Sequence, residues 1–119
     1  MAEITSYPHR VEPQDVDFTL RASVAAVINY MLNVAGVDAH NKGFGVDALQ
    51  GQSFTWVLSR LGVEVYRQPK QYEQIVVDTW VNEFNRLSST RNFKLKSGEE
   101  VLAQGVSQWG MLNMETRQA

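Results

Sequence analysis

The stretch VAAVINYMLNVA, residues 24–35, decides the fold because its apolar side chains repeat with the period of an α-helix. The apolar positions are spaced i, i+3, i+4, i+7, i+8 and i+11, which places them on one side of a helix. They are Val24, Val27, Ile28, Met31, Leu32 and Ala35. The pattern predicts one core-facing helix in which Val27, Ile28, Met31 and Leu32 are buried.

Flanking residues set the expected ends of this helix. Ser23 or Thr19 can cap the first backbone N–H groups, because Ser and Thr are preferred at that position. Gly36 follows the last apolar residue, where a helix commonly ends in a left-handed conformation. We therefore predict a helix from about Ala22 to Ala35.

The sequence on both sides of the helix predicts strands. Residues 36–52 are rich in Gly, Asp and Asn and predict a loop, with one helical turn near Val46–Leu49. From Ser53 the apolar period drops to two, and one largely apolar face is formed by Val57, Ser59, Leu61, Val63 and Val65. Further strands are predicted at 75–84, 89–96 and 101–113, with turns at 67–71 and 97–100, and one more strand precedes the helix at 4–16.

One long helix among antiparallel strands predicts an α+β domain. With a single helix available, the economical packing is an antiparallel sheet of five or six strands that curls around it. The sequence contains neither internal repeats nor a linker, so residues 1–119 are expected to form a single domain. A sheet wrapped around a central helix is the hotdog architecture.

The composition argues against several classes of function. The net charge is −2, and Lys and Arg are scattered singly, so the basic surface of a nucleic-acid-binding protein is missing. No apolar run approaches the roughly 20 residues of a membrane span, and the N-terminus does not resemble a signal peptide, which predicts a cytoplasmic protein without membrane contact. The chain has no Cys, and His9 and His40 lack ligand or triad spacing, so we expect no metal site, no cofactor and no serine hydrolase.

Three ordered motifs resemble one enzyme family across most of the chain. Residues 55–81, TWVLSRLGVEVYRQPKQYEQIVVDTWV, are similar to the second and third strands of the N-terminal hotdog of acyl-acyl-carrier-protein (acyl-ACP) thioesterases. Residues 107–118, SQWGMLNMETRQ, resemble the last strand of that hotdog, and residues 15–36 resemble the start of its helix. The resemblance implies a hotdog fold and an acyl-ACP substrate.

The catalytic positions of that family depart from its pattern here. Family members contain two hotdogs, and the resemblance places their catalytic Asp-x-Asn-x-His motif in a second copy, which we expect to lie beyond this chain. At the corresponding position this sequence has Asp15 and Asp17, followed by Leu20 and Arg21 where single-domain relatives have Gly and His. Asp15 and Asp17 are candidate catalytic carboxylates; the alternative is that they are solvated and favour the positive end of the helix.

The resemblance also implies a tunnel for the acyl chain. Trp56, Arg60, Trp80 and Trp109 lie on strands that line or support this tunnel in the family, and Ser89 and Arg91 lie on the strand associated with chain-length selectivity. The alternative is that the three Trp side chains only fill the ends of a curved sheet.

Together these observations predict the acyl-binding half of an acyl-ACP thioesterase, a hydrolase of fatty acid biosynthesis. The expected partners are an acyl carrier protein bearing a fatty acyl chain and either a second copy or a second hotdog, because a bare sheet edge favours pairing. The alternative is a non-catalytic hotdog that binds acyl chains or serves as a dimerisation module. A dehydratase is disfavoured because neither His lies at the start of the helix.

Overall fold

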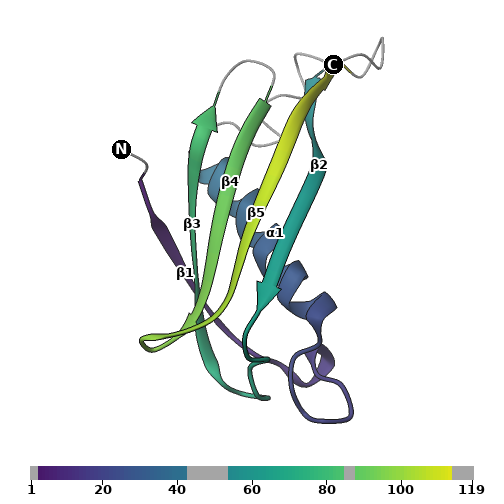
Figure 1. The fold of residues 1–119 in the computed structure, drawn as a ribbon, viewed down its shortest axis with the longest axis vertical. Coiled ribbons are helices and arrows are strands. Elements are labelled where there is room, and N and C mark those ends of the chain that lie inside the picture. Colours follow the sequence, from purple (N-terminus) through teal and green to yellow (C-terminus); the bar gives the residue numbers. More distant parts are fainter. Residues whose placement is uncertain (1–2, 43–53, 85–87, 114–119) are drawn as a thin grey trace.

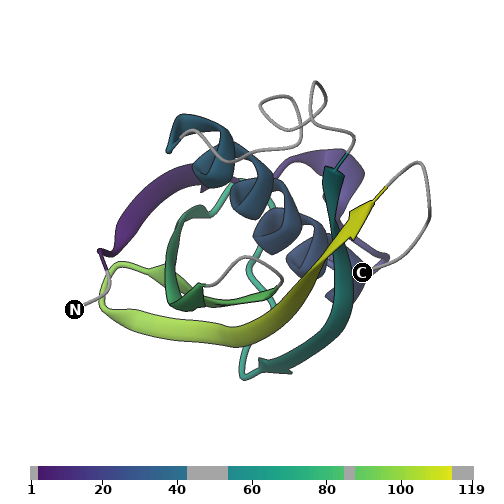
Figure 2. The ribbon, with the colours of Figure 1, turned by 90° about the horizontal axis from the view of Figure 1, so that it is seen from above.

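In the computed structural model, which describes residues 3–42, 54–84 and 88–113, an antiparallel sheet lies against one long helix (Figure 1). The chain order is β1 (Thr5–Arg10), a 3-10 helix η1 (Pro13–Asp15), α1 (Val24–Asn41), β2 (Phe54–Val65), β3 (Gln74–Phe84), β4 (Ser88–Ser97) and β5 (Glu100–Asn113). The strands follow the order β1-β3-β4-β5-β2, and the sheet curves around α1 (Figure 2). The predicted α+β arrangement is confirmed, with five strands.

Helix α1 begins at Val24, two residues after the predicted start at about Ala22, and it also ends later than predicted. The Ser23 hydroxyl accepts a hydrogen bond from the backbone N–H of Ala26, so Ser23 is the N-cap. The predicted end at Ala35 is wrong, because the helix continues through Gly36 to Asn41. Gly36 is exposed within the helix, where glycine costs about 1 kcal/mol relative to Ala, and the buried Asp38 anchors the extra turn.

The longer helix buries a different face from the predicted one. The buried residues are Ala26, Val27, Tyr30, Met31, Val34, Ala35 and Asp38. Val27 and Met31 are buried as predicted, whereas Ile28 and Leu32 are only half-buried and Val24 is 49% exposed. The helix is therefore rotated relative to the predicted stripe, so that Tyr30 and Asp38 point toward the protein.

Strand β1 is shorter than the predicted strand 4–16. It ends at Arg10, and Pro13 opens the short helix η1. Proline has no backbone N–H to donate to a sheet, and its fixed φ suits the first turn of a helix. The Glu12 and Asp15 side chains close a capping box around this turn.

Strand β2 contains a bulge that reverses its alternation. The register with β5 shifts between Leu58 and Arg60, so an extra residue changes which side chains face the helix. Val57, predicted to be in the apolar face, is 43% exposed, whereas Leu58 is half-buried. Beyond the bulge, Leu61, Val63 and Val65 are half-buried as predicted.

The core lies between α1 and the central strands. Its largest fully buried side chains include Phe93, Met31, Ile75 and Leu95. Gly105 allows Met31 to approach β5, because a Cβ at this glycine would lie 2.9 Å from the Met31 sulfur. The turn at 97–100 is confirmed, with Gly98 at φ +60°, and β2 and β3 flank the predicted turn at 67–71.

The helical turn predicted at Val46–Leu49 lies outside the described residues. Among the residues that are described, no helix is long and apolar enough to cross a membrane.

Candidate functional site

The sheet register divides the predicted tunnel residues between two faces. Ser89 pairs with Trp109, Trp109 with Leu58, and Trp56 with Met111, so these side chains share one surface of the sheet. Arg91 lies in the same phase of β4 as Phe93 and Leu95, which are buried beneath α1. The structure therefore brings Trp56, Ser89, Arg91 and Trp109 together on the helix-facing surface.

Arg60 and Trp80 lie on the opposite surface. Arg60 pairs with the exposed Gln108, and Trp80 pairs with Asn92 on β4. The β2 bulge is responsible for Arg60, because without the extra residue Arg60 would share the phase of Trp56 and Leu58. These two residues are placed to support the wall of a tunnel but not to line its interior.

Trp109 is held by a short chain of hydrogen bonds. Its indole Nε1 donates to the Ser107 hydroxyl at 2.8 Å, and that hydroxyl donates to the Arg91 carbonyl oxygen at 3.1 Å. Ser107 is fully buried, and Trp109 packs against the hydrophobic core. The indole is thus fixed in orientation beside Ser89, its cross-strand partner.

Arg91 is buried in an ion pair with Asp38. Its Nη1 lies 2.7 Å from Asp38 Oδ2 and donates to the Thr79 hydroxyl at 3.2 Å. Asp38 also accepts hydrogen bonds from the Tyr7 hydroxyl at 2.7 Å and from Lys42 Nζ at 3.0 Å. Arg91 is 4% exposed and Asp38 is 0% exposed, so this guanidinium is committed to the protein interior.

The network fixes the charge of Asp38. Burial alone would raise the pKa of its carboxyl, but hydrogen bonds from Tyr7, Arg91 and Lys42 outweigh burial and hold that pKa below its ordinary value. The pKa of Tyr7 is raised, by burial and by its bond to Asp38. The Asp38 side chain therefore stays ionised between α1 and the sheet, with Arg91 and Lys42 as its two cationic partners.

Asp15, the first catalytic candidate, connects the short helix η1 to α1 through hydrogen bonds. Its carboxylate accepts hydrogen bonds from the Glu12 backbone N–H at 3.1 Å and from the Tyr30 hydroxyl at 2.9 Å. Burial and the Asp15 carboxylate raise the pKa of Tyr30. His9 Nε2 lies 3.9 Å from this carboxylate, and the His9 ring packs on Tyr30 with centroids 4.6 Å apart.

Asp17, the second candidate, closes a local turn. Its Oδ1 accepts hydrogen bonds from the backbone N–H of Thr19 at 2.8 Å and from the Thr19 hydroxyl. These bonds lower the pKa of Asp17. A general base needs a pKa near the working pH, so this carboxylate is poorly suited to proton transfer.

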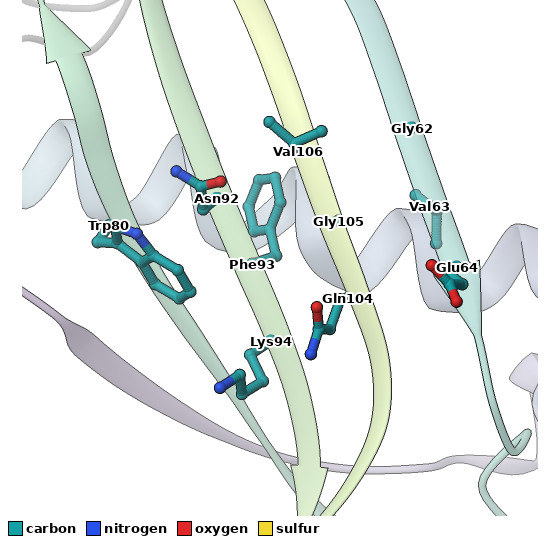
Figure 3. A pocket seen from close by; sticks show the side chains of 10 residues that line it. All are labelled: Gly62, Val63, Glu64, Trp80, Asn92, Phe93, Lys94, Gln104, Gly105 and Val106. Carbon is teal, nitrogen blue, oxygen red and sulfur yellow. The ribbon is translucent and has the colours of Figure 1, made fainter.

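Surface depressions lie beside several of these residues. A cleft of about 150 Å³ opens between β1 and α1, lined in part by His9, Tyr30 and Val34. A shallow groove of about 520 Å³ crosses the outer face of the sheet, where Trp80, Asn92 and Val106 lie on neighbouring strands (Figure 3). In the part of the chain that the structure describes, no three His, Asp or Glu side chains lie close enough together to hold a metal ion.

Sequence reasoning missed Asp38, Tyr7 and the His9–Tyr30 contact. Asp38 follows Val27, Met31 and Val34 at helical spacing, so extending the buried stripe past Gly36 finds it. The contact of His9 with Tyr30 depends on how β1 crosses α1, which local spacing does not encode.

A helix packed into a curved antiparallel sheet, with aromatic and small polar side chains turned toward the helix, defines a hotdog domain of the kind found in thioesterases. An acyl-ACP thioesterase from Bacteroides thetaiotaomicron superposes with a TM-score of 0.90 and 39% identity, covering 97% of this chain and 48% of that one. The 12:0-ACP thioesterase from Umbellularia californica shares the fold, with a TM-score of 0.85, 22% identity and coverage of 97% and 45%.

The sequence places the chain more narrowly within this class. The family model of the acyl-ACP thioesterase N-terminal domain matches residues 4–119, so the chain belongs to this family. The chloroplastic oleoyl-acyl carrier protein thioesterase of Coriandrum sativum is 27% identical over 111 residues, which cover 87% of this chain and 30% of the relative. The chain thus spans about a third of that relative and about half of the Bacteroides structure.

Proposed function

We propose that this chain is the acyl-binding hotdog of an acyl-ACP thioesterase, a hydrolase that releases fatty acids from acyl carrier protein in fatty acid biosynthesis. The observation that carries the proposal is the gathering of Trp56, Ser89 and Trp109 on the helix-facing surface at one end of the sheet. Burial of each methylene contributes roughly 0.8 kcal/mol, so the length of an apolar space beside these residues translates into chain-length preference. The family match supports an acyl-ACP substrate.

The residues before α1 favour separate domains for acyl binding and for hydrolysis. Asp15 is bonded to Glu12 and Tyr30, and Asp17 to Thr19, so neither carboxylate is free to act on a thioester. This supports the proposal that this domain binds the acyl chain while the hydrolytic residues come from a second hotdog. The alternative is a non-catalytic hotdog that only binds acyl chains or serves as a dimerisation module. Strand β2 is an edge strand of the described sheet, and this edge is the proposed pairing surface for that partner or for a second copy.

Substitution at the helix-facing surface tests the acyl-binding role. Ser89→Phe places a bulky ring beside Trp109, whereas Thr90→Phe places the same ring on the other face of β4. We expect Ser89→Phe to weaken binding of a thioether analogue of palmitoyl-ACP about tenfold more than binding of the octanoyl analogue. Thr90→Phe is expected to preserve the wild-type ratio. An unchanged ratio in Ser89→Phe would contradict the proposal.

A further inference from the structure

Two strained segments meet at the end of the molecule where α1 begins, the lower end in Figure 1. Leu20 has φ 61° and Tyr72 has φ 68°, a left-handed conformation that bulky residues rarely adopt. The segments are joined by an antiparallel bridge between Arg21 and Lys70 and by a hydrogen bond from Gln71 N–H to the Leu20 carbonyl at 2.9 Å. Residues held in such conformations cluster at ligand-binding sites.

A cleft of about 370 Å³ lies where these segments join. Its lining residues are Thr19, Leu20, Arg21, Lys70, Gln71 and Tyr72. The two cations of this cleft, Arg21 and Lys70, form no ion pair with a carboxylate among residues 3–42, 54–84 and 88–113. The Arg21 guanidinium donates a hydrogen bond from Nη1 to the Gln68 carbonyl oxygen at 3.0 Å. The cleft therefore presents guanidinium and ammonium groups whose charge is not compensated by a direct ion pair.

The nearby carboxylates form no ion pair with the side chains of Arg21 and Lys70. Asp17 accepts its hydrogen bonds from the backbone N–H and the hydroxyl of Thr19. Glu73 forms an ion pair with Arg67 at 2.8 Å and also accepts a hydrogen bond from the Lys70 backbone N–H at 2.9 Å. Glu12 is paired with Arg10 at 2.6 Å. The side chains of Arg21 and Lys70 therefore remain available to an external anion at this end of the molecule.

We infer that this cleft binds the phosphate of the phosphopantetheine arm that carries the acyl group, an inference that rests on the proposed function. Guanidinium and ammonium groups bind phosphate oxygens through charge-assisted hydrogen bonds, and the Gln71 amide adds a neutral donor. Leu20 and Tyr72 supply apolar contact for the carbon chain that follows the phosphate.

The position of the cleft agrees with the shape of such a ligand. Strand β2 begins and strand β5 ends at the opposite end of the molecule, whose longest dimension is 45 Å (Figure 1). Trp56 lies near the start of β2, and Trp109 and its partner Ser89 lie beside it in the sheet register. An acylated phosphopantetheine carries its phosphate at one end and its apolar chain at the other. One extended ligand can therefore present a charged group and a fatty chain to two separated regions.

Paired ligands that differ only in the phosphate test the inference. Titration calorimetry on the full chain would compare S-palmityl phosphopantetheine thioether with S-palmityl pantetheine thioether. We expect the wild type to bind the phosphorylated ligand about threefold to tenfold more tightly at low salt. Lys70→Gln and Arg21→Gln should each remove most of this difference while leaving the affinity for the unphosphorylated ligand unchanged.

Lys94→Gln is the matched control, because Lys94 lies in the outer groove of the sheet and should retain the full preference. Equal wild-type affinity for the two ligands, or an equal loss in Lys94→Gln, would overturn the phosphate site while leaving acyl binding intact. Inorganic phosphate that binds as tightly as the phosphorylated ligand would indicate a free-phosphate site and overturn the assignment to the arm. Failure of both thioethers to bind would instead overturn the proposed function.

Discussion

At the scale of residues, the ion pair between Asp38 and Arg91 organises the interior beneath the helix-facing surface. Both side chains are buried, and Lys42 and Tyr7 complete the hydrogen bonding of the carboxylate. Because the Arg91 carbonyl also accepts a hydrogen bond from Ser107, which in turn holds Trp109, the pair is connected to the proposed acyl-binding region. Removing one partner of a buried pair is costly because the other charge is left uncompensated.

A thermodynamic cycle measures this effect. Arg91→Met leaves Asp38 buried with only Lys42 as a cation and is expected to lower the free energy of unfolding by about 3 kcal/mol. The double variant Asp38→Leu, Arg91→Met removes both charges and should be closer in stability to the wild type. Urea unfolding followed by tryptophan fluorescence would provide the values. A cost below about 1 kcal/mol for Arg91→Met would contradict the role given to this pair.

A second ion pair predicts how stability depends on pH. The Arg67 guanidinium lowers the pKa of Glu73 from 4.5 to about 2. A carboxyl with a lowered pKa in the folded state stabilises the protein above its unfolded pKa, and that contribution is lost as pH falls from about 4.5 to about 2. Since one pKa unit corresponds to about 1.4 kcal/mol, the contribution is on the order of 3 kcal/mol.

Glu73→Gln should therefore be less stable than the wild type at neutral pH and should lose less stability between pH 4.5 and 2, measured by urea unfolding at each pH. Glu99→Gln, in the exposed turn between β4 and β5, should keep the wild-type profile. Parallel profiles for the wild type and Glu73→Gln would show that the ion pair does not control acid stability.

At the scale of elements, the sequence could predict the order of helix and strands but not their exact phase. Alternating apolar residues identified β2, yet a bulge between Leu58 and Arg60 is set by pairing with β5 and has no signature in the strand itself. Gly36 suggested a helix end because glycine favours left-handed caps, but tertiary burial of Asp38 continues the helix past it. The bulge also separates Arg60 from the other predicted tunnel residues on β2 and β5, because it turns Arg60 to the outer face of the sheet.

The edge position of β2 predicts association. Wild-type chain is expected to dimerise through this edge at micromolar concentration, as bare edges pair readily. Val57→Glu introduces a charge at a 43% exposed position of β2 and should shift the protein toward monomer in size-exclusion chromatography with light scattering. Val106→Glu, equally exposed at 44% but on the interior strand β5, should not. A monomeric wild type, or dissociation by Val106→Glu, would argue against pairing through β2.

At the scale of the whole molecule, the chain has side chains suited to binding an acyl chain but no carboxylate placed for catalysis among the described residues. The helix-facing surface carries fixed aromatic side chains, whereas the carboxylates at the helix start are bonded to their own neighbours. Membership of the acyl-ACP thioesterase family was readable from the motifs at 55–81 and 107–118, and the match over residues 4–119 confirms it. The roles of Asp15 and Asp17 were not readable, because they depend on contacts with Tyr30 and Thr19 that form only in the fold.

The most direct test compares binding with turnover in the same preparation of purified chain. Binding of the palmitoyl-ACP thioether analogue and hydrolysis of palmitoyl-ACP would be measured side by side. We predict saturable binding with hydrolysis at the background rate, because loss of a principal acid–base group typically costs about 10²-fold to 10⁴-fold in rate. Efficient hydrolysis by this chain, abolished by Asp15→Asn or Asp17→Asn in a variant that remains folded, would contradict the claim that the domain binds the acyl chain without cleaving it.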